Sequence, residues 1–181
     1  METSRSLSPA TRRNRVERMS IYNCTSTATM LDAGEKRMRR LRTGFFVFMN
    51  TALVQWFSKQ QATIETSVFR AEFVAMKIGM ESLRGLRYKL HMMGVGIAGP
   101  SSIYGDNMSV IHNTQRQESM LKKKSNSICY HAVRESVAMG ESITGHIGTN
   151  ENVGDLTTKV LHGQKRQYMV SQLLYDIYDD H

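Results

Sequence analysis

Hydrophobic residues along this chain recur at spacings that predict strands and helices in turn. Aromatic and β-branched residues are frequent over 45–50 and 52–57, which predicts two strands joined by a short turn at Asn50 and Thr51. From 64 to 93, apolar residues recur every three or four positions, which predicts a long helix. The remaining expected elements are strands over 102–105 and 142–147 and helices over 107–114, 125–139, 150–161 and 169–177.

The order of these elements predicts an α/β fold in which a hairpin leads into a mixed sheet flanked by helices. Residues 1–25 are rich in Ser, Thr and Arg and lack apolar periodicity, so we expect a flexible basic arm there. We expect one domain over 26–162, followed by a C-terminal helix or tail over 163–181.

The composition excludes several classes of protein. The chain has 181 residues, of which 40% are hydrophobic and 22% are charged, so wholesale disorder is not expected. No apolar run approaches the roughly 18 residues of a membrane span, and no signal peptide is visible. The two cysteines are too few for a disulfide framework. We therefore expect an intracellular protein, cytoplasmic or nuclear, that is neither secreted nor bound to a membrane.

The net charge of +8 is unevenly distributed. Arginines and lysines concentrate in residues 1–42 and in the run Lys122, Lys123 and Lys124. Such clusters attract the phosphate backbones of nucleic acids, although a solvated arm would have the same composition.

Three carboxylates occupy positions that suggest more than a solvated surface. Glu72 lies in the predicted long helix with only apolar neighbours one turn away, namely Val68, Phe69, Ala75 and Met76. Its carboxylate should therefore point into a buried stripe, unless it sits at the edge of that stripe and reaches water. Asp106 follows a predicted strand, and Asp155 lies in the first turn of a predicted helix. A helix cap and a helix-dipole partner are their structural alternatives.

An acid from a helix, one from a strand end and one from a helix start can converge on one patch. Without a cation, the carboxylates in such a patch would repel one another. Mg²⁺ takes carboxylate oxygens, waters and phosphate oxygens as ligands. Two such ions can support hydrolysis of a phosphodiester.

Five ordered motifs stand out along the chain. They are the hairpin segments Arg42-Thr43-Gly44-Phe45-Phe46-Val47 and Trp56-Phe57-Ser58-Lys59-Gln60, the helix segment 66–75 around Ala71-Glu72-Phe73, the strand end Ile103-Tyr104-Gly105-Asp106-Asn107-Met108-Ser109, the helix segment Tyr130-His131-Ala132-Val133-Arg134-Glu135, and Asp155-Leu156-Thr157-Thr158-Lys159. As a set they resemble the ribonuclease H domain of copia-type (LTR retrotransposon) Pol polyproteins, in which that domain follows a reverse transcriptase.

The resemblance implies a ribonuclease H-like fold, a mixed five-stranded sheet flanked by helices, whose first strand could here be degraded or missing. It implies hydrolysis of the RNA strand of an RNA–DNA hybrid with two Mg²⁺ (or Mn²⁺) ions. It assigns the catalytic and metal-binding acids to Glu72, Asp106 and Asp155. It also implies a reverse transcriptase as the ancestral partner in the same polyprotein.

The first catalytic acid of this family does not carry over. Aligning the chain on Ala33 and Gly34 puts Thr29 at the position of the missing Asp. Asp32 is the nearest acid, but it lies three residues on, so on a strand it would face the opposite side. We therefore expect hydrolysis to be impaired.

Several other residues are candidates for auxiliary roles. His146 lies where related enzymes carry a mobile histidine, although a histidine on a strand face would look the same. Candidate contacts to nucleic acid are Lys59, Gln60, Asn107, Lys122, Lys123 and Lys124. The alternatives to an impaired nuclease are a non-catalytic nucleic-acid-binding relic and a helical protein-interaction module built on the Met-rich long helix.

Overall fold

A mixed five-stranded sheet forms the centre of the computed structural model, which describes residues 15–16, 18–29, 39–61, 68–115 and 127–174. The strands are β1 (Arg15–Val16), β2 (Met19–Thr29), β3 (Arg39–Met49), β4 (Ala52–Gln60), β5 (Gly96–Ile97), β6 (Ser101–Gly105) and β7 (Ser142–His146). The helices are α2 (Val68–Met92), α3 (Met108–Gln115), α4 (Ser127–Ala138), the 3₁₀ helix η2 (Val153–Thr157) and α5 (Gly163–Ser171).

The strand order in the sheet is β4-β3-β2-β6-β7. β2, β3 and β4 pair antiparallel, whereas β6 and β7 continue the sheet parallel to β2. The α/β architecture expected from the sequence is therefore confirmed, and the first strand of the sheet, β2, is present.

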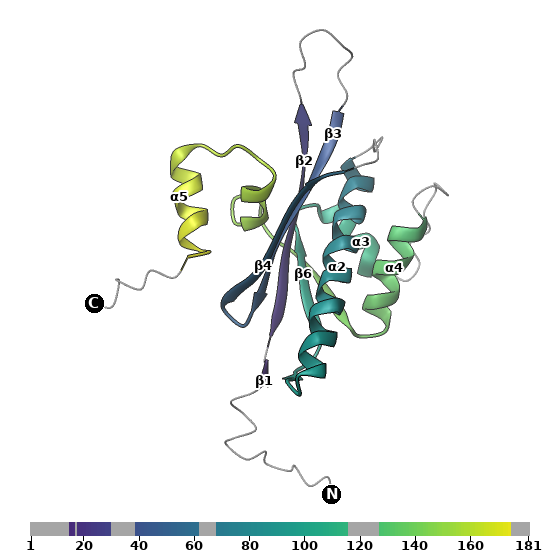
Figure 1. Ribbon diagram of the computed structural model, residues 1–181. Helices are drawn as coiled ribbons and strands as arrows, with labels where there is room; N and C mark the ends of the chain where they lie inside the picture. The colour runs from purple at the N-terminus through teal and green to yellow at the C-terminus, as the bar shows by residue number, and fades with distance from the viewer. Residues whose placement is uncertain (1–14, 17, 30–38, 62–67, 116–126, 175–181) are drawn as a thin grey trace, which may run out of the picture.

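Helices cover both faces of this sheet. Figure 1 shows α2, α3 and α4 on one face and α5 with the short η2 segment on the other. The alternation along β3 explains the two layers, because Phe45 and Val47 join the core under α2 while Phe46 and Phe48 pack with Val153 of η2.

Local signals predicted several elements closely. The hairpin turn falls at Asn50, whose positive φ of 57° is a conformation that Asn tolerates better than most residues. Asn107 begins α3 as expected: its side-chain oxygen accepts hydrogen bonds from the backbone N–H groups of Ser109 and Val110. Gly94 and Gly140, both with positive φ, follow the ends of α2 and α4.

Three expectations require correction. Residues 19–25 lie in β2, so the predicted flexible arm does not extend to residue 25. The helix expected over 150–161 is the shorter η2, which Asn152 caps by accepting from the N–H of Gly154. The last helix begins at Gly163 rather than at Met169, which is its only fully buried side chain.

The five-stranded sheet contradicts the alternative that the chain folds as a helical interaction module. Met76 and Met80 of α2 are buried in the core, whereas Met92 at the end of α2 and the adjacent Met93 are exposed. Within the described part of the chain, no helix has the length and hydropathy needed to cross a membrane.

Candidate functional site

Glu72, Asp106 and Asp155 come from three different elements and lie near the carboxyl end of β6. Asp106 directly follows β6, Glu72 lies near the start of α2, and Asp155 lies in η2. The charge of Asp106 acts on Glu72, and the ammonium group of Lys159 lies 3.9 Å from Asp106 Oδ2 and 2.7 Å from Asp155 Oδ1. The structure therefore brings the three predicted acids into one cluster, linked through Lys159.

Glu72 is largely buried, as its apolar helical neighbours predicted. Burial and, to a smaller extent, the negative charge of Asp106 raise the pKa of Glu72 to about 7. A hydrogen bond from Asn107 and the charge of Lys159 act in the opposite direction. This carboxyl group therefore keeps its proton to a higher pH than an exposed glutamate does.

Asp155 is the most deeply buried acid of the cluster, with 1% of its side chain exposed. Both of its carboxylate oxygens face ammonium groups, because Lys165 of α5 lies 3.4 Å from Oδ2. The Lys165 ammonium also donates to the carbonyl oxygen of Thr149. A buried carboxylate needs such partners, since an unpaired charge in this position would be strongly destabilising.

The position of Asp155 depends on close packing of η2 against the hairpin. Gly44 of β3 leaves room for the side chain of Thr157, because a Cβ atom at position 44 would overlap it. The hydroxyl group of Ser58 in β4 donates to the carbonyl oxygen of Thr157 at 2.6 Å. Both segments of the hairpin motif thus hold η2, the helix that carries Asp155.

His146 and Asn107 flank the cluster. His146 ends β7 opposite Gly105, and its Nε2 lies 3.2 Å from the backbone oxygen of Asp106. Asn107 caps α3 and also bonds to Glu72. Both residues lie at the acid cluster, but their predicted functional roles remain predictions.

Of the predicted nucleic-acid contacts, Lys59 and Gln60 lie at the same end of the sheet as η2. Lys59 is exposed and pairs with Thr43, one residue from Gly44. Lys122, Lys123, Lys124 and the weak acid candidate Asp32 lie outside the described residues.

The register of β2 does not bring Thr29 to this cluster. Thr29 pairs with Arg39, whereas Gly44, against which η2 packs, pairs with Cys24. Five residues of strand separate the two levels, a distance of roughly 17 Å. The β2–β3 pairing continues without a break to the end of both strands, so nothing shifts this register. Residue 24 of β2, not residue 29, therefore lies level with the cluster.

The residues in this arrangement do not fit two divalent ions. Within the described ranges, no three His, Cys, Asp or Glu side chains are placed to hold a metal ion together. The ammonium group of Lys159 already lies between Asp106 and Asp155, and the β2 sequence from Met19 to Thr29 contains no Asp or Glu. Lys159 therefore stands where a metal ion bridging Asp106 and Asp155 would bind.

Sequence reasoning assigned no role to Lys159 or Lys165. A signal for Lys159 was present, because it lies four residues after Asp155, the spacing at which opposite charges pair on a helix. No local signal pointed to Lys165, which reaches Asp155 from the next helix.

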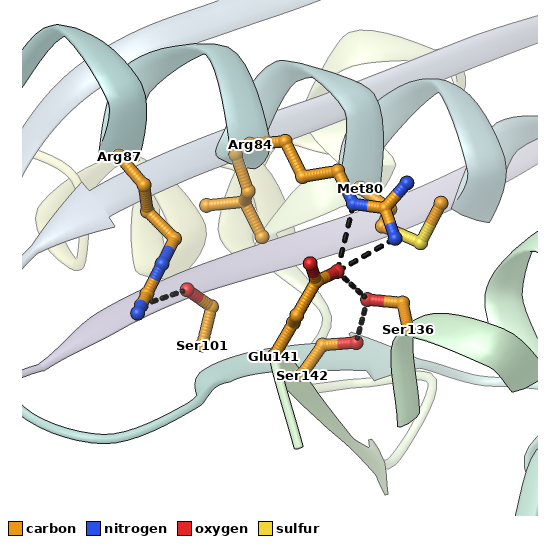
Figure 2. A pocket seen from close by; sticks show the side chains of 8 residues that line it. Met80, Arg84, Arg87, Ser101, Ser136, Glu141 and Ser142 are labelled. Atoms are coloured by element: carbon orange, nitrogen blue, oxygen red, sulfur yellow. Dashed lines mark hydrogen bonds and ion pairs between the residues drawn. The ribbon is translucent and has the colours of Figure 1, made fainter. Parts of the chain in front are cut away.

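A separate cavity of about 290 Å³ lies at the opposite ends of the parallel strands. Figure 2 shows Arg84 and Ser136 directed toward Glu141, and Arg87 directed toward Ser101. Hydrogen bonding to Arg84 lowers the pKa of Glu141 from its ordinary value. These groups connect α2, α4 and the starts of β6 and β7, and they include none of the predicted site residues.

Curated relatives of this chain are transposon polyproteins. It is 24% identical over 141 residues, 78% of its length, to the retrovirus-related Pol polyprotein from transposon RE1 of Arabidopsis thaliana. It is 27% identical over 133 residues, 74% of its length, to the corresponding polyprotein from transposon TNT 1-94 of Nicotiana tabacum. The chain spans about 10% of the length of each of these relatives. No protein-family model matches the chain.

Solved structures with a similar fold include ribonuclease H1 proteins and a viral protease-reverse transcriptase. LC11-RNase H1, solved in complex with an RNA/DNA hybrid, superposes with a TM-score of 0.57 at 14% identity, covering 77% of this chain and 93% of that one. The foamy viral protease-reverse transcriptase, also solved with an RNA/DNA hybrid, gives a TM-score of 0.54 at 12% identity, covering 87% of this chain and 21% of that one.

These comparisons confirm the resemblance inferred from the motifs. The homologues are retrovirus-related Pol polyproteins of transposons, and the fold is ribonuclease H-like. At these identities the structural likeness establishes the fold alone.

Proposed function

We propose that this chain is a ribonuclease H-type domain that binds RNA–DNA hybrids and whose hydrolysis of the RNA strand is impaired. The observation that carries the proposal is the acid cluster of Glu72, Asp106 and Asp155 at the strand ends, with Lys159 between two of its members. The cluster is where this fold gathers ligands, and its charge balance argues against efficient metal-assisted hydrolysis.

Binding of a hybrid is supported by charge and by likeness. The chain carries a net charge of +8, which favours association with phosphate backbones. Two proteins of similar fold were solved with RNA/DNA hybrids, and the relatives are Pol polyproteins, which suggests a reverse transcriptase as the ancestral neighbour of this domain.

Residues near the cluster offer contacts for a nucleic-acid backbone. Lys59 is exposed on β4 at the end of the sheet where η2 packs, and Gln60 follows it. Such contacts would position the duplex without selecting its sequence, because lysine and amide groups at a surface bind phosphate oxygens.

Fluorescence anisotropy with labelled duplexes tests the binding claim. At low salt the full chain should bind an RNA–DNA hybrid, and the affinity should fall steeply as salt rises. Lys59→Gln should weaken binding several-fold and reduce the salt slope by about one, whereas Lys77→Gln, on the surface of α2, should leave it unchanged. An absence of hybrid binding at low salt would remove the proposal.

The same samples test the second half of the proposal. With Mg²⁺ or Mn²⁺, the wild-type chain should cleave the hybrid no faster than Asp106→Asn. Robust cleavage that Asp106→Asn abolishes would show that the site is active. Equal affinity for hybrid, double-stranded DNA and single strands would favour the simpler alternative, a non-catalytic nucleic-acid-binding relic.

A further inference from the structure

We propose that Lys159 is the resident cation of the acid cluster and excludes divalent metal ions from it. The inference concerns the site assigned under the proposed function, but it requires neither hybrid binding nor hydrolysis. Measurements made without nucleic acid can therefore test whether Lys159 excludes metal ions.

Lys159 occupies the place that a shared cation would take. Its ammonium group forms a short, charge-assisted contact of 2.7 Å with Asp155 Oδ1 and lies 3.9 Å from Asp106 Oδ2. These two acids belong to different elements, η2 and the end of β6, so one positive charge reduces the repulsion between them.

A metal ion binding between Asp106 and Asp155 would have to break the ion pair of Lys159 with the buried carboxylate of Asp155. Asp155 is 1% exposed, and its second oxygen faces Lys165 at 3.4 Å, so a new ligand would have to compete with an ammonium group at each oxygen. Displacing Lys159 would move its ammonium group away from both acids, while Mg²⁺ gives up its bound water reluctantly. The exchange is therefore unfavourable in two respects.

The backbone keeps Lys159 next to its partner. The N–H group of Lys159 donates to the carbonyl oxygen of Asp155 at 2.8 Å, so the two residues are joined by one helical turn. Because the ammonium group is tethered in this way, it competes for Asp155 as an intramolecular ligand, whereas a metal ion must come from solution.

Thermal unfolding with and without divalent ions tests the inference directly. The melting temperature of the wild-type chain should be the same in EDTA and in millimolar Mn²⁺ or Mg²⁺. Lys159→Met should show a rise of several degrees with Mn²⁺, because the freed carboxylates can then bind the ion. Lys159→Arg, which keeps the charge, should behave as the wild type does.

Lys77→Met is the matched control. Lys77 is exposed to a similar extent as Lys159 and also pairs with an acid four residues away, Glu81, but it lies on α2 away from the cluster. This variant should show no response to Mn²⁺.

A Mn²⁺ titration followed by electron paramagnetic resonance keeps the inference testable if Lys159→Met does not fold. The wild type should bind no more Mn²⁺ than Asp106→Asn does. A wild-type melting temperature that rises with Mn²⁺ and loses this rise in Asp106→Asn would overturn the inference. A folded Lys159→Met that gains no response to Mn²⁺ would overturn it as well.

Discussion

The ammonium group of Lys159 lies 2.7 Å from Oδ1 of Asp155, a carboxylate with 1% of its side chain exposed. The pair links the fold to the site, because the same lysine lies 3.9 Å from Asp106 at the end of β6. The positive charge of Lys159 thus offsets the negative charges of Asp155 and Asp106 without a bound ion.

Removing this lysine should destabilise the fold. Lys159→Met leaves Asp155 buried with Lys165 as its remaining ammonium partner at 3.4 Å. We expect a loss of about 1–3 kcal/mol in the free energy of unfolding, measured in urea. Lys77→Met, which removes an exposed ion pair, should lose under about 1 kcal/mol.

The double variant Lys159→Met/Asp155→Asn separates pairing from packing. Because the buried charge leaves together with its partner, the loss should be smaller than the sum of the two single losses. Strict additivity would show that the two side chains do not interact.

Glu72 should make the stability depend on pH. Its pKa is about 7 in the folded protein against about 4.5 unfolded, so between these values the folded state retains a proton that the unfolded chain has lost. The free energy of unfolding should therefore fall as pH rises through this window, by at most about 3 kcal/mol, and level off above it.

Comparison with Glu72→Gln isolates this contribution. The variant has no proton to lose at position 72, so its stability should fall less than that of the wild type between pH 4.5 and 7. Glu81→Gln, at an exposed site on the same helix, should keep the wild-type slope. Parallel curves for the wild type and Glu72→Gln would contradict the burial of this carboxyl group.

Gly44 should be intolerant of any side chain. A Cβ at this position would overlap Thr157, so Gly44→Ala should push η2 away from β3 and cost about 1–3 kcal/mol in urea unfolding. Gly85→Ala in α2 is the control, because no atom lies within 4 Å of the added carbon. This variant should be stabilised by about 0.5–1 kcal/mol. Equal effects at both glycines would contradict the packing of η2 on the hairpin.

Local signals sufficed for α2, the hairpin and the start of α3. The apolar period of α2 and the cap at Asn107 are properties of neighbouring residues, so they are visible in sequence. β2 was missed because residues 22–29 are mostly Ser, Thr and other polar residues without alternation. Its strand conformation comes from pairing with β3 and β6, which no local pattern encodes.

The site was predictable in part for the same reason. The motifs and the apolar surroundings of Glu72 indicated the three acids before their positions were known. The place of Lys165 depends on how α5 folds back onto η2, and the level of position 24 depends on the register of β2. Both depend on the tertiary structure, which the spacing of residues along the sequence does not determine.

Anomalous diffraction from wild-type crystals soaked in Mn²⁺ tests the central claim most directly. The account predicts no Mn²⁺ peak between Asp106 and Asp155, with the ammonium group of Lys159 occupying that place. Two Mn²⁺ peaks about 4 Å apart, bound by Glu72, Asp106 and Asp155 with Lys159 turned away, would contradict it.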